Sequence, residues 1–282
     1  MELDTIICGD NATVMATWPD ACIDLVVTSP PYDDLRKYGG HSWDFPAVAR
    51  ELTRILKPGG VIVWVVDSKT VDGSETLSAF QQALHFKNVC GLKVWDTMIW
   101  HKPNPAPGDG KFRYHQAWEF MFVLTPTRPS VLNLIRDVES TMPGYVDIRN
   151  FDRRRDQSND FKGRKPYTRQ EFGFRSNVWT IAKSPAAEDA IAKEGHPAIF
   201  PEALPRDHIL TWSNPGDVVL DPFAGSGTTL KMAKEHGRRY IGIEVCPEYV
   251  AICAKRIAQG VLPLVPNAPK GMALHRKRRK RW

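Results

Sequence analysis

The sequence lacks the patterns of several large protein classes. No uninterrupted apolar run in its 282 residues approaches the length of about 18 residues that a membrane-spanning helix needs. The first residues, MELDTIICGD, begin with acids and continue as a strand pattern, so we expect no signal peptide and a cytoplasmic protein. The five cysteines are odd in number and never have the spacing of a metal knuckle. We therefore expect reduced thiols, and neither a disulfide framework nor a metal site.

Positive charge is concentrated in two segments of the chain. The formal net charge is +6, and the segment 276–281 alone contributes six Lys/Arg and no acid. Residues 149–175 contain nine Lys/Arg against four Asp/Glu, which leaves the remaining chain slightly acidic. Such basic patches indicate a polyanion, and above all a nucleic acid, as the partner. The candidate contacts are Arg153, Arg154, Arg155, Lys162, Arg164, Lys165 and Arg169 in one segment, and Arg276, Lys277, Arg278, Arg279, Lys280 and Arg281 in the other.

Short apolar strands alternate with segments of helical periodicity along most of the chain. This alternation predicts an α/β fold with a mostly parallel central sheet, and the near-continuous Val/Ile runs indicate strands that are covered on both faces. The composition, 42% hydrophobic and 25% charged, suits one large domain or a domain with an insertion. We predict strands at 4–8, 23–28, 61–66, 93–101, 117–124, 217–221 and 239–244, and helices at 43–57, 75–87, 203–213, 227–236 and 247–259. The sequence KPGG at 57–60 predicts a helix end followed by a turn into the next strand.

The alternation stops between residues 126 and 195. This segment is rich in Arg, Asp, Asn and Gly, has aromatic residues interleaved, and is too long for an ordinary connection. It is therefore either a functional insertion or a partly disordered loop. From residue 261 to 282, closely spaced prolines followed by the basic run predict a flexible tail.

A glycine-rich turn between two predicted strands is the strongest local signal. In the segment VVLDPFAGSGTTLKMAKEHGRRYIGIEV, a strand ends at Asp221, the turn contains Gly225 and Gly227, and a helix follows. The next strand ends at Glu244. Glycine lets the backbone approach a ligand closely and direct free N–H groups toward it. Because an acid at the end of the neighbouring strand is placed to accept hydrogen bonds from ribose hydroxyls, this pattern predicts a nucleoside site.

Three kinds of nucleoside ligand compete for this turn. A phosphate-binding loop needs G-x-x-x-x-G-K-[ST], and its lysine is missing here. A dinucleotide site prefers G-x-G-x-x-G, but Leu230 occupies the place of the third glycine. S-adenosylmethionine (SAM) has a nucleoside and an amino acid but no phosphate, so it needs a tight turn and a ribose-binding acid without a phosphate cradle. We therefore expect SAM as the cofactor.

The sequence TSPPY at 28–32 follows the apolar run IDLVV at the end of a predicted strand. Its two consecutive prolines remove backbone donors and impose an extended backbone, so the carbonyl groups after the strand are not used by a helix. Rigid carbonyls, the Ser29 hydroxyl and the Tyr32 ring together suit a planar group that bears an amino nitrogen. Acceptors that hold both N–H bonds of a nucleobase amine out of the ring plane would make the amine a better nucleophile.

These two motifs resemble those of the SAM-dependent DNA amino-methyltransferases. SPPY at 29–32 is similar to the catalytic motif [DNS]-P-P-[YFW] of that family, and DPFAGSGT at 221–228 is similar to its cofactor motif F-x-G-x-G. The catalytic motif comes first, as in the permuted beta group. The resemblance covers residues 1–259 and implies a Rossmann-like SAM-dependent methyltransferase fold. It implies a catalytic domain in two parts, 1–125 and 196–260, a target-recognition insertion at 126–195, and a basic tail at 261–282.

The resemblance also implies roles for individual residues. Ser29 and the carbonyl of Pro30 would hold the target amine, with Pro31 fixing the backbone, and Tyr32 would stack on the flipped base. The implied cofactor-binding residues are Asp10, Phe200, Glu202, Asp221, Pro222, Phe223, Ala224, Gly225, Ser226, Gly227, Thr228, Glu244 and Val245. Two plainer interpretations stay open, namely Asp10 as the N-cap of a helix that follows it, and Tyr32 as core filling.

Ser29 bears on which base is methylated. Within the family, Ser-Pro-Pro-Tyr usually accompanies N4-cytosine methylation and Asp-Pro-Pro-Tyr usually accompanies N6-adenine methylation. The resemblance therefore favours N4 of cytosine, with N6 of adenine as the alternative. Methylation at carbon 5 of cytosine needs a thiolate, typically in a Pro-Cys dipeptide, which this sequence lacks. An RNA or protein N-methyltransferase is a more distant alternative. The glutamine methylases have a similar Asn-Pro-Pro-Tyr motif, but their cofactor motif comes first in the chain, which is the reverse of the order here.

The implied partner is double-stranded DNA, from which the target base must leave the helix to react. The insertion and the tail supply cations suited to base edges and phosphates. A cognate restriction endonuclease is a further candidate partner, and we expect a monomer or homodimer. The implied location is the nucleoid of a prokaryotic or phage-infected cell.

Overall fold

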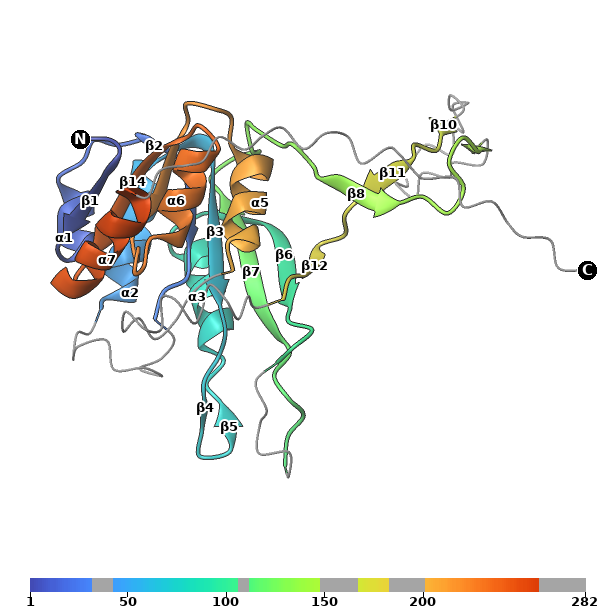
Figure 1. Ribbon diagram of the computed structural model, residues 1–282. Helices are drawn as coiled ribbons and strands as arrows, with labels where there is room; N and C mark the ends of the chain where they lie inside the picture. The colour runs from blue at the N-terminus through green and yellow to red at the C-terminus, as the bar shows by residue number, and fades with distance from the viewer. Residues whose placement is uncertain (32–42, 106–111, 148–166, 183–200, 259–282) are drawn as a thin grey trace, which may run out of the picture.

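A computed structural model describes residues 1–31, 43–105, 112–147, 167–182 and 201–258. Its centre is an eight-stranded sheet in the order β1-β14-β13-β2-β3-β7-β6-β12 (Figure 1). The strands are β1 (Thr5–Cys8), β2 (Ile23–Thr28), β3 (Leu56–Val66), β6 (Lys93–His101), β7 (Trp118–Thr125), β12 (Val178–Thr180), β13 (Val218–Asp221) and β14 (Arg239–Glu244). Among these described strands, β7 alone runs antiparallel to its neighbours. The predicted α/β fold with a mostly parallel sheet is confirmed.

Helices cover both faces of this sheet (Figure 1). They are α1 (Asn11–Ala16), α2 (Phe45–Ile55), α3 (Ser78–Asn88), α5 (Ala203–Trp212), α6 (Thr228–Glu235) and α7 (Pro247–Ala258). Side chains of α1, α2 and α3 join one hydrophobic cluster, and side chains of α5, α6 and α7 join the other. Strand β3 contributes Ile62, Trp64 and Val66 to the first cluster and Val61, Val63 and Val65 to the second. Because successive side chains of a strand point to opposite faces, this apolar run is buried on both sides.

The prediction of a turn at KPGG (57–60) is wrong. Helix α2 ends at Ile55, before the predicted end at residue 57, and residues 56–60 already belong to β3. Leu56 pairs with Ile23, and the register then shifts before Leu25 pairs with Val61. Gly59 has a φ of +80°, in the left-handed region that favours glycine. The glycines therefore permit an irregularity within the strand, rather than a turn before it.

Part of the segment 126–195 projects from the sheet as two-stranded ribbons (Figure 1). These pair β8 (Arg136–Glu139) with β11 (Phe172–Phe174), and β9 (Val146–Asp147) with β10 (Tyr167–Thr168). By contrast, β12 is an edge strand of the main sheet, and its buried Trp179 stacks on His208 of α5 with the ring centroids 4.4 Å apart. The projecting part thus ends before β12, and the assignment of 126–195 to target recognition stays a prediction. The predicted tail, 261–282, lies outside the described residues.

Two further observations concern only the described part of the chain. None of its helices combines the length and the apolar character that crossing a membrane requires. Nor do three or more His, Cys, Asp or Glu side chains gather there in a group that could hold a metal ion. All five cysteines carry free thiols, of which Cys253 is buried and Cys8 is exposed.

Candidate active site

The two sequence motifs meet at the carboxyl ends of neighbouring strands. Strand β2 ends at Thr28, strand β13 ends at Asp221, and the two strands are paired in parallel. The Thr28 hydroxyl donates a hydrogen bond to Asp221 Oδ1 at 2.7 Å. From the first turn of α6, the Thr229 hydroxyl donates to the Val27 carbonyl at 3.2 Å. These bonds fix the start of the predicted catalytic motif against the glycine-rich turn.

The predicted catalytic residues follow β2 directly. Ser29 and Pro31 are half-buried and Pro30 is buried, whereas Tyr32 lies outside the described residues. Thr28, the last residue of β2, pairs with Trp64 near the end of β3, so the motif starts at the carboxyl end of both strands. The motif therefore leaves the sheet at the edge where open α/β sheets bind their ligands.

Asp221 is buried beneath this edge. Its carboxylate accepts hydrogen bonds from the Thr28 hydroxyl and from the Phe223 N–H, the latter at 3.1 Å. Burial raises the pKa of Asp221 to about 6, and the nearby Glu244 carboxylate adds to the rise, while the hydrogen bonds lower it. Asp221 is thus held in an environment that favours its neutral form.

The stability of the protein is expected to fall as the pH rises from about 4 to about 6 through the titration of Asp221. In this window the folded protein keeps a proton that the unfolded chain, with an aspartate pKa near about 3.9, has already lost. The shift to about 6 corresponds to about 3 kcal/mol. Relative to Asp221→Asn, the wild type should lose about that much free energy of unfolding between pH 4 and pH 7 in urea titrations. A difference that does not change with pH would contradict this assignment.

The glycine-rich turn has left-handed backbone at Gly225, with a φ of +49°, and at Gly227, with a φ of +79°. A Cβ atom at Gly227 would lie only 2.4 Å from Cys253 Sγ of α7. Both the backbone conformation and the close packing therefore require glycine at position 227. The turn therefore packs closely against α7.

Glu244, at the end of β14, holds this turn through its side chain. Its Oε2 accepts a hydrogen bond from the Gly225 N–H at 2.9 Å, and its Oε1 accepts one from the Cys246 N–H at 3.0 Å. In a phosphate-binding loop, such N–H groups face the phosphate instead. A carboxylate in this place would repel a phosphate, so the geometry fits a nucleoside ligand without one. The Glu244 side chain is half-buried.

The segment after β1 contributes two polar side chains. Asp10 Oδ1 accepts a hydrogen bond from the Thr13 N–H at 2.8 Å, so Asp10 is the N-cap of α1 and the plainer interpretation is confirmed. Asn11 is buried and donates through Nδ2 to the Pro222 carbonyl at 3.1 Å, which fixes the turn from its other end. Asn11 had no signal in the sequence, because a polar residue in the first turn of a helix is usually exposed.

A buried arginine of α7 connects the glycine-rich turn with α5. Arg256 donates to the Thr228 hydroxyl at 2.8 Å, to the Ser226 hydroxyl at 3.1 Å and to Glu202 Oε1 at 2.9 Å. Lys231 donates to the same Glu202 oxygen at 2.7 Å. Burial acts to raise the pKa of Glu202, but the hydrogen bonds from Lys231 and Arg256 outweigh it and lower the pKa. Three predicted cofactor-binding residues are therefore joined by Arg256, which the sequence did not single out.

The other predicted site residues differ in their surroundings. Phe223 packs edge-on against Trp43 with the ring centroids 4.9 Å apart, Ala224 is buried, and Val245 is exposed. Arg169, on the projecting ribbons, places its guanidinium 5.6 Å from the centroid of the Tyr145 ring. The predicted site residues that lie outside the described part of the chain are Tyr32, Phe200, Arg153, Arg154, Arg155, Lys162, Arg164, Lys165, Arg276, Lys277, Arg278, Arg279, Lys280 and Arg281.

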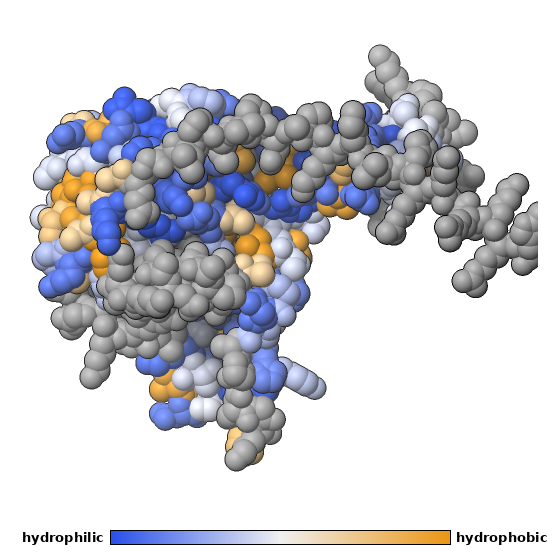
Figure 2. Space-filling view, viewed as in Figure 1, coloured by the Kyte–Doolittle hydropathy of each residue, from blue (hydrophilic) through white to orange (hydrophobic). Residues whose placement is uncertain are grey.

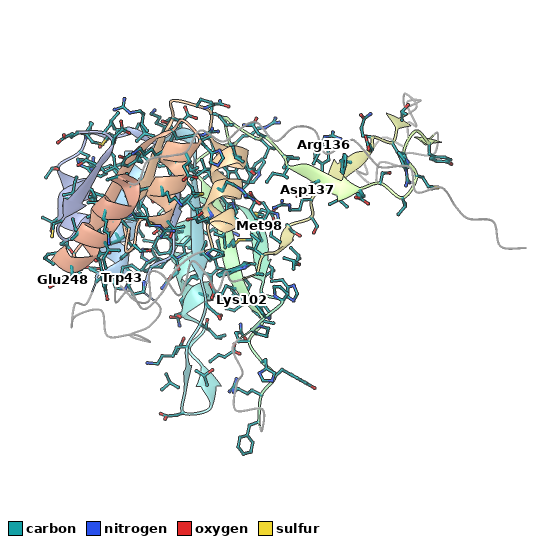
Figure 3. The ribbon with its side chains drawn as sticks, in the orientation of Figure 1. Trp43, Met98, Lys102, Arg136, Asp137 and Glu248 are labelled. Atoms are coloured by element: carbon teal, nitrogen blue, oxygen red, sulfur yellow. The ribbon has the colours of Figure 1, made fainter. Side chains whose placement is uncertain are left out.

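Charged side chains lie at the ends of β3, β6 and β7, at the same edge of the sheet. Lys102 and Glu119 form an ion pair in which both side chains are mostly buried, and Asp67 Oδ2 accepts a hydrogen bond from the Gln116 amide at 3.1 Å. Burial raises the pKa of Asp67, and Glu119 adds to the rise. Figure 3 shows Lys102 beyond the end of β6, and Arg136 and Asp137 on β8 of the ribbons. The pairing of β6 and β3 with β7 brings Lys102, Glu119 and Asp67 together, although they are separated in the sequence.

Known proteins are similar to this chain in sequence and in fold. The family model described as DNA methylase matches residues 23–255. The chain is 46% identical over 246 residues to the orphan methyltransferase M.BamHII of Bacillus amyloliquefaciens, which covers 86% of this chain and 91% of that protein. The solved PvuII DNA methyltransferase (cytosine-N4-specific) superimposes with a TM-score of 0.64 at 22% identity, over 89% of this chain and 85% of that one. A complex of M1.HpyAVI with SAM superimposes with a TM-score of 0.59 at 25% identity, over 90% and 98% of the two chains.

These similarities point to the same family as the two motifs, which lie side by side at one edge of the sheet. The family model extends over most of the chain, and the relative from Bacillus amyloliquefaciens matches nearly end to end. The chain therefore belongs to the N6/N4 DNA methylase family, and it is a DNA amino-methyltransferase with the α/β methyltransferase fold.

Proposed function

We propose that the protein methylates N4 of cytosine in double-stranded DNA, with SAM as the methyl donor. The observation that carries this proposal is the position of Ser29-Pro30-Pro31, which leaves β2 beside the glycine-rich turn and is tied to it through Thr28 and Asp221. N6 of adenine is the alternative, because both amines present two N–H donors to the same acceptors. The PvuII enzyme, whose name records N4-cytosine specificity, shares the fold and supports the first assignment.

Acidic residues beside the glycine-rich turn fit SAM in charge. SAM supplies its methyl group as an electrophile on a positively charged sulfur. Glu244 offers the lone pairs that its two backbone hydrogen bonds leave free to the ribose hydroxyls. The negative charges of Glu244 and Asp10 complement a cationic ligand. The complex of M1.HpyAVI with SAM supports this cofactor assignment.

Ser29 and Pro30 would prepare the amine for reaction. The amine nitrogen of cytosine is a poor nucleophile because its lone pair is delocalised into the ring. The Ser29 hydroxyl and the Pro30 carbonyl would each accept a hydrogen bond from one N–H group. They would hold the two N–H bonds out of the ring plane, which localises the lone pair on the nitrogen. The buried Pro30 and the fixed φ of two prolines keep these acceptors in place before the base arrives, so little reorganisation is needed.

The DNA contacts belong to the same proposal. Arg169 and the other predicted cations at residues 153–165 and 276–281 would neutralise phosphates and read base edges, with Tyr32 stacking on the extruded cytosine. The described ribbons carry Arg136 and Arg169 against aromatic rings, which supports a role for 126–195 in contacting DNA.

The proposed reaction is tested by following the methyl group into product. Purified protein is incubated with methyl-labelled SAM and plasmid DNA, and the DNA is digested to nucleosides and separated. We expect the label in N4-methylcytosine. Label in N6-methyladenine would assign the enzyme to the alternative base, and label taken up from matched RNA or protein samples but not from DNA would contradict the proposal.

Arg256→Met is expected to raise the Kd for SAM at least about 10-fold. The substitution leaves the Ser226 and Thr228 hydroxyls and Glu202 without their buried partner, so the turn loses its support from α7. Lys231→Met is the matched control, because it removes the other partner of Glu202 without touching the turn hydroxyls. Calorimetry should show a much smaller change for the control. Equal losses in the two variants would mean that Arg256 acts through Glu202 alone.

A further inference from the structure

Two segments that the proposed chemistry does not use project from the catalytic edge of the sheet. One is the hairpin of β4 (Thr70–Val71) and β5 (Ser74–Glu75), which extends beyond the end of β3 (Figure 1). The other, residues 112–116, leads directly into β7, the neighbour of β3. Arg113 joins the two, because its guanidinium donates to the Gly73 carbonyl and lies 3.7 Å from Glu75 Oε1. We term the segments 70–75 and 112–116 together the finger.

The finger has a defined conformation. At the tip of the hairpin, Asp72 and Gly73 have φ values of +48° and +78°, as a tight two-residue turn with a left-handed backbone requires. At its base, the Thr76 N–H donates to the Lys69 carbonyl at 2.8 Å. The Gln116 amide donates to Asp67 Oδ2 at 3.1 Å and to the Trp118 carbonyl at 3.0 Å. The segment 112–116 is thus anchored to Asp67, which follows β3 directly.

Large apolar side chains of the finger face solvent. Phe112 is 88% exposed and Tyr114 is 101% exposed, on alternate residues of the same short segment. Val71 of the hairpin is 43% exposed, and Figure 2 shows hydrophobic and hydrophilic residues mixed on this projection. Single exposed apolar residues are common on protein surfaces, but a cluster at the end of an ordered projection indicates a binding surface.

We infer that the finger inserts an aromatic ring, Phe112 or Tyr114, into the duplex and fills the space that the extruded target base leaves. Removing a base from the helix costs stacking and pairing energy, and apolar wedges compensate by stacking on the neighbouring bases. The finger starts from the edge at which Ser29 lies, and both of its aromatic rings are exposed there. The inference rests on the proposed function in one respect, that the target base leaves the duplex.

The test compares two DNA duplexes, one with a matched target base pair and one with a mismatched target base pair. The methylated position is first located by sequencing. In single-turnover reactions, Phe112→Ala/Tyr114→Ala should methylate the matched duplex at least about 10-fold more slowly than wild type. On the mismatched duplex, where the base is already weakly held, the loss should shrink to less than about threefold. Because both rings are exposed, the melting temperature and the Kd for SAM should not change.

Trp95→Ala is the matched control, since Trp95 is 42% exposed and lies near the opposite end of β6. It should leave both rates unchanged. Equal losses on the two duplexes, or no loss on either, would overturn the inference. A change in oligomeric state of the double variant would also overturn it, because the rings would then bind a second copy of the chain. If the enzyme methylates adenine, the N4-cytosine proposal fails. The ratio of the rates on the matched and mismatched duplexes, with adenine as the target base, still tests the finger.

Discussion

Ser29→Ala is expected to lower kcat by about 100-fold or more while the Kd for SAM stays within about twofold of wild type. Removing one preorganised hydrogen-bonding group from a charge-stabilising site typically costs about 100- to 1,000-fold in kcat. Ser29 is half-buried and follows Thr28, whose hydroxyl already donates to Asp221, so the Thr28 hydroxyl does not replace it. Single-turnover rates and calorimetry with SAM separate the two quantities.

Ser29→Asp is the informative companion to this variant. It keeps a hydrogen-bond acceptor at the same position. If the role of Ser29 is to accept a hydrogen bond from the target amine, Ser29→Asp should retain more activity than Ser29→Ala. Equal inactivity of the two variants would show that the position tolerates only serine for reasons of packing. A kcat for Ser29→Ala within about threefold of wild type would contradict the assignment of Ser29 to the amine.

Glu244→Ala is expected to weaken SAM binding by about 100-fold or more. The variant removes the acceptor of the Gly225 N–H and of the Cys246 N–H, which releases the turn, and it removes the proposed partner of the ribose. Each charge-assisted hydrogen bond contributes about 1.5–3 kcal/mol, so losing two or more of them accounts for the expected factor. The affinity for SAM is measured directly by calorimetry.

A cofactor analogue distinguishes the two roles of Glu244. If the carboxylate binds the ribose, a deoxyribose analogue of SAM should bind the wild type about 10-fold more weakly than SAM does, whereas Glu244→Ala should not discriminate between the two ligands. Glu248→Ala is the control, because Glu248 lies in the first turn of α7 and accepts a hydrogen bond from Cys246 Sγ. If Glu244→Ala still bound SAM about 10-fold more tightly than the deoxyribose analogue, Glu244 would hold the turn without binding the ribose.

The fold was predictable where the sequence carries a continuous local pattern. The run around Val61–Val66 predicts a strand buried on both faces, and its alternate residues do enter the two hydrophobic clusters. The prediction was wrong at KPGG because proline and glycine indicate a turn, whereas the pairing of Leu56 with Ile23 continues the strand through them. The edge strand β12 escaped prediction for a related reason, since three residues carry no period and only pairing with β6 defines it.

The site was predictable as two motifs but not as one network. Asp221 and Glu244 stand at strand ends, where position alone indicates a ligand site. The bond from Thr28 to Asp221 and the contacts of Arg256 with Ser226, by contrast, join residues that only the tertiary fold brings together. In the sequence, Arg256 belongs to an ordinary helical pattern of α7, and nothing in that pattern distinguishes a buried arginine from an exposed one.

Nucleoside mass spectrometry of DNA tests the central claim most directly. The chain is expressed in cells that lack other DNA amino-methyltransferases, with the Ser29→Ala variant expressed in parallel, and the DNA is digested completely. The proposed function predicts N4-methylcytosine in the DNA of cells that express the wild type, and at least about 100-fold less with the variant. N6-methyladenine in place of N4-methylcytosine would contradict the assignment of the target base.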